Sequence, residues 1–391
     1  MADHQISKFK GINNVADRLR MSEGWLSVAD NVDITNTGAI VRRAGSTLAL
    51  ACSPTAAYTT KDYSRMYIVN NGVVTAVTSD MQLIPLYSLT AATTMYWAEI
   101  NQQVYFYNGT DGGAILPNNV VLPLIWTPPA TPTLMAISGN LDAGLYHVSC
   151  TFILADGRET GNSVMAEIVL TQGQAIRINY IPQVAGATTA VYIQPANSAI
   201  YQLAMLTTNT SEIWNSSADQ LGRELLYEFL DPLPLSSTSL TFWKSRLHVA
   251  QFLPASNTTV IWRSKPLAFH LFDLNAEFIL VPGEVLMLCP TDDALVIGTG
   301  QQIFSYDGDK LTENANYGVV RGASWAADEN DQKWFWSSRG LCQALPFSNV
   351  TIDQMSVQSG SNVGAGIVFR NGVKQFVAAL HQGGTAFNPR T

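Results

Sequence analysis

The chain has 391 residues, of which 47% are hydrophobic and only 13% are charged. Soluble proteins average roughly 25% charged residues, so this surface is poor in charge. The centres of subunit interfaces are depleted in charge, which favours a chain that assembles with other subunits. An ordinary β protein with a bland surface is the alternative. The length allows two or three domains, or one large β assembly with an insertion.

The formal net charge is −8, from 22 Lys and Arg residues against 30 Asp and Glu residues. Proteins that grip nucleic acid cluster their Lys and Arg side chains against phosphates. The densest basic spots here are Arg18 with Arg20, and the pair Arg42 and Arg43. We interpret these as solvated strand ends or interface pairs. An acidic protein can still surround DNA, because like charge keeps a passing polyanion off the wall.

The cysteines form no motif: they lie far apart, at Cys52, Cys150, Cys289 and Cys342. This spacing predicts buried thiols rather than a zinc site or a redox pair. The N-terminal residues carry charges and lack the apolar core of a signal peptide. No stretch has the roughly 18 uninterrupted apolar residues of a membrane span. We therefore expect a protein without a membrane span, made in a reducing cytoplasm, with no metal and no cofactor.

In the N-terminal part, short strands alternate with Asn, Asp and Gly turns. A strand, an Asn-Gly turn and a second strand occur around Gly72, and a similar pattern reaches Gly109. Asn-Gly and Asp-Gly are preferred in type I′ turns, which need positive φ at both central residues, so these segments predict β-hairpins. Further along, turn glycines recur every 32 residues, at Gly308, Gly340 and Gly372. A period of this size in an all-β chain predicts propeller blades of about four strands each.

The repeat is interrupted in the middle of the chain. Several prolines between Pro123 and Pro132 mark a linker, because proline fixes φ and cannot donate to a strand ladder. About seven strand-length runs then follow between residues 130 and 232, which suits a fibronectin III-like β-sandwich. We expect one short helix at residues 221–227.

From Thr241 onward the propeller pattern returns, with strands around residues 242–250, 260–267 and 286–299 and a last hairpin that ends at Val377. The predicted fold is therefore an all-β propeller of six to eight blades with an inserted sandwich. Its parts are residues 1–128, 129–235 and 236–391. Because an open sheet edge invites aggregation, we predict a closed ring in which residues near the N-terminus, 28 to 45 among them, complete a C-terminal blade.

These motifs also carry a resemblance. Residues 9–14, 25–33 and 38–45, then Arg246-Leu247-His248-Val249-Ala250, the segment 262–267 and the strand 292–299 occur in an order similar to that of the tail nozzle family. These proteins of short-tailed bacteriophages are also called packaged-DNA stabilisation or tail tubular proteins. The resemblance implies a propeller with a sandwich between two runs of blades. The motifs are turns and strand cores, and the chain lacks the long C-terminal extension of some relatives.

The resemblance implies a structural protein of the virion. We expect a homo-oligomeric ring, six-fold by family resemblance, that extends the portal axis and retains or passes duplex DNA without reading its sequence. Its neighbours would be a head-to-tail adaptor or portal-proximal protein and a tail fibre or tail needle. The alternatives are a module that binds a host glycan or a tail fibre, a glycan hydrolase, and a virion β protein with no gate.

The sequence nominates no catalytic, cofactor-binding or metal residues, and we expect no enzyme. Asp292 and Asp293 could be an acid pair, but adjacent strand residues point to opposite faces, so a turn is the better interpretation. Asp307 begins a segment like a calcium loop that lacks the later oxygen ligands, which predicts a hairpin tip. Residues 334–336 could stack on a sugar, but core packing is favoured. The histidines have no ligand spacing; they are His4, His147, His248, His270 and His381.

Overall fold

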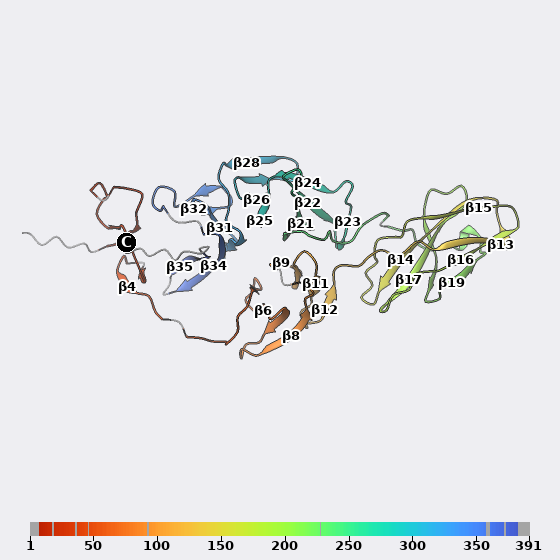
Figure 1. Ribbon diagram of the computed structural model, residues 1–391, viewed down its shortest axis with the longest axis horizontal. Coiled ribbons are helices and arrows are strands. Elements are labelled where there is room, and N and C mark those ends of the chain that lie inside the picture. Colours follow the sequence, from red (N-terminus) through yellow and green to blue (C-terminus); the bar gives the residue numbers. More distant parts are fainter. Residues whose placement is uncertain are drawn as a thin grey trace, which may run out of the picture.

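The computed structural model describes residues 8–17, 19–35, 37–45, 47–91, 94–226, 228–356, 360–370 and 373–381. Within these ranges the protein is all-β, as predicted, and its one helix is a 3-10 turn at Ala218–Gln220. No helix in this part of the chain is long and apolar enough to cross a membrane. Figure 1 shows an elongated molecule, with a sandwich at one end, an arc of small sheets in the middle and the N-terminal strands at the other end.

Small sheets follow one another along the arc, and all their strand pairs are antiparallel except the pair β29–β34 in the last sheet. The first and second sheets precede the sandwich, and each is a four-stranded meander. Their strands are β5 (Ala56–Thr59), β6 (Met66–Asn70), β7 (Val73–Val77) and β8 (Leu83–Ser88), then β9 (Tyr96–Ile100), β10 (Gln103–Tyr107), β11 (Gly112–Ile115) and β12 (Val121–Pro123).

Four more sheets follow the sandwich. The third has the order β20-β21-β22-β24, with β23 paired to the end of β22, while the fourth and fifth are again four-stranded meanders. The sixth has the order β29-β34-β35. The strands are β20 (Ser239–Trp243), β21 (Arg246–Leu253), β22 (Thr258–Lys265), β23 (Ala268–Phe272), β24 (Phe278–Pro282), β25 (Val285–Pro290), β26 (Leu295–Thr299), β27 (Ile303–Tyr306), β28 (Leu311–Ala315), β29 (Gly322–Ala323), β30 (Trp325–Ala327), β31 (Lys333–Ser337), β32 (Gly340–Gln343), β33 (Ser348–Asn349), β34 (Asn362–Arg370) and β35 (Val373–His381).

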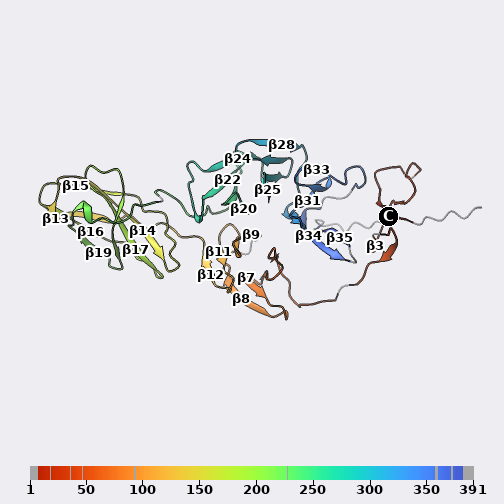
Figure 2. The same ribbon diagram turned by 180° about the vertical axis from the view of Figure 1, so that it is seen from behind.

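Each pair of consecutive sheets shares an apolar core. Phe106 lies between the first and second sheets, Phe272 between the second and third, and Ile297 between the third and fourth. Phe335 lies between the fourth and fifth sheets, and Trp336 packs against the sixth. The chain thus buries its apolar strand faces by stacking sheet on sheet, and Figure 2 shows the same arc from behind.

The insertion is a sandwich of seven strands. One sheet has the order β13-β16-β19 and the other β15-β14-β17-β18, and both contribute to one core that includes Val148, Ile176 and Trp214. The strands are β13 (Thr133–Leu141), β14 (Gly144–Leu154), β15 (Ala166–Leu170), β16 (Gln174–Asn179), β17 (Ala187–Gln194), β18 (Gln202–Thr207) and β19 (Ser211–Trp214).

The sandwich is attached to the third sheet by backbone and side-chain contacts. Asp231 and Phe272 exchange two backbone hydrogen bonds of 2.9 Å, which join the end of the insertion to β23. The His270 ring Nε2 lies 2.8 Å from the Glu159 carbonyl oxygen. Gly161 packs so closely on Leu230 that a Cβ would lie 1.8 Å from the Leu230 carbonyl oxygen.

The turns follow the predicted chemistry in part. Asn71 and Gly72 have φ of 51° and 73°, so the predicted two-residue hairpin between β6 and β7 is confirmed. The pattern at Gly109 forms a longer connection, because the Asn108 side chain accepts backbone hydrogen bonds from Thr110 and Asp111. Gly372 lies outside the described residues.

Two predictions fail. The helix expected at 221–227 is absent from the described part of that segment, because Gly222 and Leu225 donate backbone hydrogen bonds to Leu203 and Tyr201 and hold the chain extended beside β18. The N-terminal residues also do not complete a C-terminal blade among the described residues. There β3 (Val32–Ile34) pairs with β4 (Ile40–Arg42), and β1 (Gly11–Ile12) pairs with β2 (Trp25–Leu26).

The cysteines are free thiols, as predicted. Cys150, Cys289 and Cys342 are buried, and Cys52 is half-buried. Burial raises the pKa of the Cys150 thiol to about 12, so this thiol is protonated at neutral pH.

Candidate functional site

The six stacked sheets outside the sandwich are called the sheet array from here on. Their turns lie at two opposite ends of the array. In a meander, the turns after the first and third strands lie at one end of the sheet and the turn after the second strand lies at the other. Contacts align these ends between sheets: the Arg65 guanidinium donates to the Gln102 carbonyl oxygen, and the Lys244 ammonium donates to the Asp307 carbonyl oxygen. We call this the turn end. It comprises residues 60–65, 78–82, 101–102, 116–120, 244–245, 291–294, 307–310, 328–332 and 344–347.

The turn end is acidic. Its turns hold nine acidic residues against four basic ones, Lys61, Arg65, Lys244 and Lys310. The acidic residues are Asp62, Asp80, Asp292, Asp293, Asp307, Asp309, Asp328, Glu329 and Asp331. Lys333 and Lys374, which lie outside these turns, pair with Asp331 and with Asp328 and Glu329, respectively. Nine carboxylates thus meet six basic groups at this end, so a net acidic chain concentrates part of its negative charge there, which the sequence alone did not reveal.

Several of these carboxylates are fixed by their own turns. Asp62 accepts hydrogen bonds from the Thr60 and Ser64 hydroxyls at 2.6 and 2.8 Å, and these bonds lower its pKa to about 2. Backbone N–H groups of Lys310 and Asp309 donate to Asp307 and lower its pKa. Both groups stay ionised at neutral pH. Asp307 is the first residue of the tight connection between β27 and β28, as predicted.

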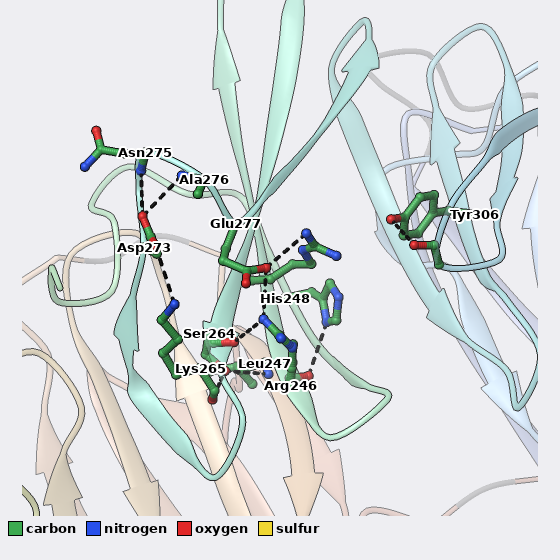
Figure 3. A network of polar contacts seen from close by, with 12 residues as sticks. Arg246, Leu247, His248, Ser264, Lys265, Asp273, Asn275, Ala276, Glu277 and Tyr306 are labelled. Carbon is green, nitrogen blue, oxygen red and sulfur yellow. Dashed lines mark hydrogen bonds and ion pairs between the residues drawn. The ribbon is translucent and has the colours of Figure 1, made fainter. Parts of the chain in front are cut away.

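A network of charged side chains lies on the third sheet (Figure 3). Glu277 lies between Arg246 and Arg263, and each guanidinium is 3.0 Å from the same carboxylate oxygen. The Lys265 ammonium is 3.4 Å from a carboxylate oxygen of Asp273 in the same loop. These acids tie the 273–277 loop to β21 and β22. We therefore assign the Glu277 and Asp273 carboxylates a structural role, because each is held in an ion pair.

The described histidines lie on separate strands: His147 on β14, His248 on β21, His270 on β23 and His381 on β35. His248 is buried beside this network, with Nδ1 3.2 Å from the Arg246 carbonyl oxygen. Burial lowers its pKa to about 4, so it is neutral at pH 7. His270 contacts Glu159, and His147 lies 3.8 Å from the Glu167 carboxylate. His4 lies outside the described residues, and within them no group of three or more His, Cys, Asp or Glu side chains could hold a metal ion.

The other residues considered as candidates for a site lie in turns or in the core, in agreement with the structural roles that the sequence favoured. Asp292 and Asp293 occupy the turn between β25 and β26, where the Thr291 hydroxyl accepts the Ala294 N–H at 3.1 Å. Phe335 and Trp336 are buried in the cores of the array. Arg43 pairs with Asp33 at 3.3 Å at the end of an exposed strand, and Arg18 lies outside the described residues.

A shallow polar groove at the opposite end of the array was not predicted. It has a volume of about 580 Å³ and lies between the fourth and fifth sheets, where the Arg339 guanidinium is stacked 5.0 Å over the Tyr317 ring. Its lining residues come from three separate connections, so no local motif marks it. They are Gly300, Gln301, Gln302, Asn316, Tyr317, Gly318, Ser338 and Arg339.

Comparisons with known proteins give only remote likenesses. No family model and no curated protein matches this chain. A functionally unknown protein from Desulfotomaculum acetoxidans is 10% identical with a TM-score of 0.33, and the match covers 90% of this chain and 94% of that one. The WD40 domain of SCAP from fission yeast is 6% identical with a TM-score of 0.29, over 75% and 60%.

A third structure is the extracellular domain of a putative hybrid two-component system from B. thetaiotaomicron, which is 10% identical with a TM-score of 0.30. That match covers 81% of this chain and 36% of the other, so this chain spans just over a third of that neighbour's length. Likenesses of this size carry no inference about function. The function must therefore be argued from the chain itself.

Proposed function

We propose that this chain is a structural subunit of a bacteriophage tail, a nozzle or head-to-tail conduit in which six copies form a ring around the genomic DNA. The observation that carries the proposal is the order of the units. Two four-stranded sheets come first, a seven-stranded sandwich follows, and a second run of sheets completes the chain. This is the order that the resemblance to the tail nozzle family implies.

We also propose that the six sheets are the blades of one propeller, which is the smallest of the expected blade numbers, six to eight. Residues 129–235 would then form a fibronectin III-like insertion. The shared core between each pair of consecutive sheets supports this interpretation, since propeller blades pack face to face.

The mechanism of the conduit is steric and electrostatic. In this proposal the acidic turn end faces the channel, where fixed carboxylates such as Asp62 and Asp307 repel the phosphates of passing duplex DNA. The charged residues at this end are mostly acidic, so they would not trap DNA as a basic groove does. A wall of this kind passes DNA of any sequence.

The proposed partners follow from the position of such a ring in a virion. One face would contact the head-to-tail adaptor or another portal-proximal protein, and the other a tail fibre or tail needle. The chain's low content of charged residues suits burial against these neighbours. The proposal assigns the protein no catalytic role.

Single-particle electron microscopy tests the proposal directly. The protein should be imaged alone and mixed with its neighbouring head-to-tail protein. We expect six-fold ring averages with an axial hole wide enough for duplex DNA, roughly 20 Å or more. Monomers in both samples would contradict the conduit and favour the glycan-binding alternative.

A further inference from the structure

The N-terminal arm, defined here as residues 8–45, has strands but no core of its own. Among its described residues no hydrophobic side chain is buried, although it contains Phe9, Trp25, Leu26 and several Val and Ile residues. Its longest paired element is the two-stranded hairpin β3–β4. A single hairpin is at best marginally stable in water, so this arm needs a surface that covers it.

One face of the hairpin is mostly apolar. Ile34 pairs with Ile40, and Val32 lies two residues from Ile34 on the same side of the sheet, where it pairs with Arg42 at the end of this face. Ile40 is 38% exposed. Val41, the next residue, points to the opposite face, where it is paired with Asp33. The two faces can therefore be tested separately.

Among the described residues, Asn14 joins the arm to the array of its own chain. Its backbone N–H donates to the Gln354 carbonyl at 3.1 Å, and its side chain exchanges two hydrogen bonds with the Ser356 backbone. Figure 1 shows the strands of the arm beyond the sixth sheet, at the end of the molecule opposite the sandwich. This places the arm where it can reach a neighbouring molecule.

One face of the sixth sheet is partly exposed and carries apolar side chains, like the face of the β3–β4 hairpin described above. Gly366 pairs with Val377, and Val368 pairs with Gln375, so these side chains share one face of the β34–β35 hairpin. Val368 and Val377 are 39% and 46% exposed. A Cβ added at Gly366 would meet nothing within 4 Å. The opposite face of the same hairpin packs on the fifth sheet through the Trp336 core.

We propose that the β3–β4 hairpin of one copy packs its apolar face on the uncovered face of β34–β35 in the next copy. This rests on the proposed ring, and it names the surfaces that close it. A second copy is the occupant because Val368 and Val377 remain 39% and 46% exposed in the single chain, although Asn14 joins the arm to Gln354 and Ser356, which shortly precede β34 in the chain. The arm and the β34–β35 face that would accept it are different surfaces, so the contact is head-to-tail. Repeated contacts of this kind form a ring when the rotation from copy to copy closes on itself.

Two matched variants test the arm by native mass spectrometry and light scattering. Ile40→Lys places a charge in the proposed interface, and Val41→Lys places the same charge on the opposite face beside Asp33. We expect Ile40→Lys to weaken assembly at least tenfold and Val41→Lys to assemble as the wild type does. The melting temperature of the array checks the fold, since the arm supplies none of its core.

A mixing experiment tests the head-to-tail geometry. Val377→Lys spoils the acceptor face while its arm stays intact, and Ile40→Lys does the reverse. Each variant alone should remain monomeric. Their mixture should form dimers without rings, because one intact contact survives per pair. If the mixture stays monomeric while the wild type assembles, the arm does not exchange between copies.

The outcomes separate this inference from the proposed function. Wild-type rings that persist in both Ile40→Lys and Val377→Lys would overturn the arm contact and leave the conduit intact. A wild type that is monomeric alone and with its neighbouring head-to-tail protein would overturn both. If Ile40→Lys impairs only the binding of that neighbour, the occupant is the other protein and the second-copy proposal is wrong.

Discussion

At the scale of single residues, His248 couples the stability of the third sheet to pH. Its pKa is about 4 in the folded chain, because burial disfavours the charged ring, and 6.5 is its ordinary value. Between these values the unfolded chain binds the additional proton. The free energy of unfolding therefore falls as the pH drops from 6.5 to 4, by about 3 kcal/mol for this group, and this contribution stops changing below pH 4.

We predict that His248→Gln makes the stability less dependent on pH in that window. Thermal or urea unfolding of both proteins at pH 7, 5.5 and 4.5 checks it. His270, whose pKa is also lowered by burial, is present in both proteins, so its contribution cancels in the comparison. Parallel stability curves for the two proteins would show that His248 is not the titrating group.

Residue chemistry also explains which turns the sequence could reveal. The Asn71-Gly72 turn is visible because only a few residue types tolerate positive φ at low cost. Gln102 and Ser245 have φ of 63° and 62° in equivalent tight turns, without a glycine. There the packing of adjacent sheets imposes the conformation, as when Arg65 donates to the Gln102 carbonyl. Such a turn cannot be predicted from the local sequence, because the constraint comes from a neighbouring sheet.

At the scale of elements, Gly161 fixes the sandwich against the array. A Cβ at this position would lie 1.8 Å from the Leu230 carbonyl oxygen, and a backbone oxygen cannot rotate away as a side chain can. We predict that Gly161→Ala lowers the free energy of unfolding by about 1–3 kcal/mol. Differential scanning calorimetry checks the melting temperature.

The matched control is Gly300→Ala, where the nearest atom to a new Cβ is Leu286 Cδ1 at 3.8 Å, an ordinary contact. This change should leave the stability within about 0.5 kcal/mol. Equal losses in the two variants would mean that the close approach at Gly161 does not hold the junction.

The helix predicted at residues 221–227 is replaced by extended chain in the described part of that segment. Residues 221–226 have helical composition in part, but their backbone N–H groups donate to Leu203 of β18 and to Tyr201 just before it. A short segment gains little from helix formation in water, so available strand edges decide its structure. Element type was predictable for the strands, because their alternation is fixed by which face is buried.

At the scale of the whole molecule, the arm and the array are energetically separate. Arg43 directly follows β4 and begins an exposed connection to the first sheet. We predict that trypsin cuts early after Arg42 or Arg43. The remaining array and sandwich should keep their melting temperature within about 2 °C, because the arm buries no apolar side chain in the described structure.

Mass spectrometry of the digest and a melting curve of the product check this. Arg263, inside β22 and paired with Glu277, is the internal control and should resist cleavage. A product that unfolds as soon as the arm is cut would show that the arm stabilises the array within one chain. Slower cleavage in assembled rings than in monomers would agree with arm exchange between copies.

The all-β class, the strand–turn–strand repeat and the interruption after Pro123 could be predicted from the sequence, because each follows from local patterns of apolar residues, turn residues and prolines. The position of the arm, the set of turns that gather at the acidic end and the meeting of Arg246, Arg263 and Glu277 depend on the folded chain as a whole. These features join residues far apart in the chain. Their partners are chosen by the stacking of whole sheets, a long-range effect that no local pattern records.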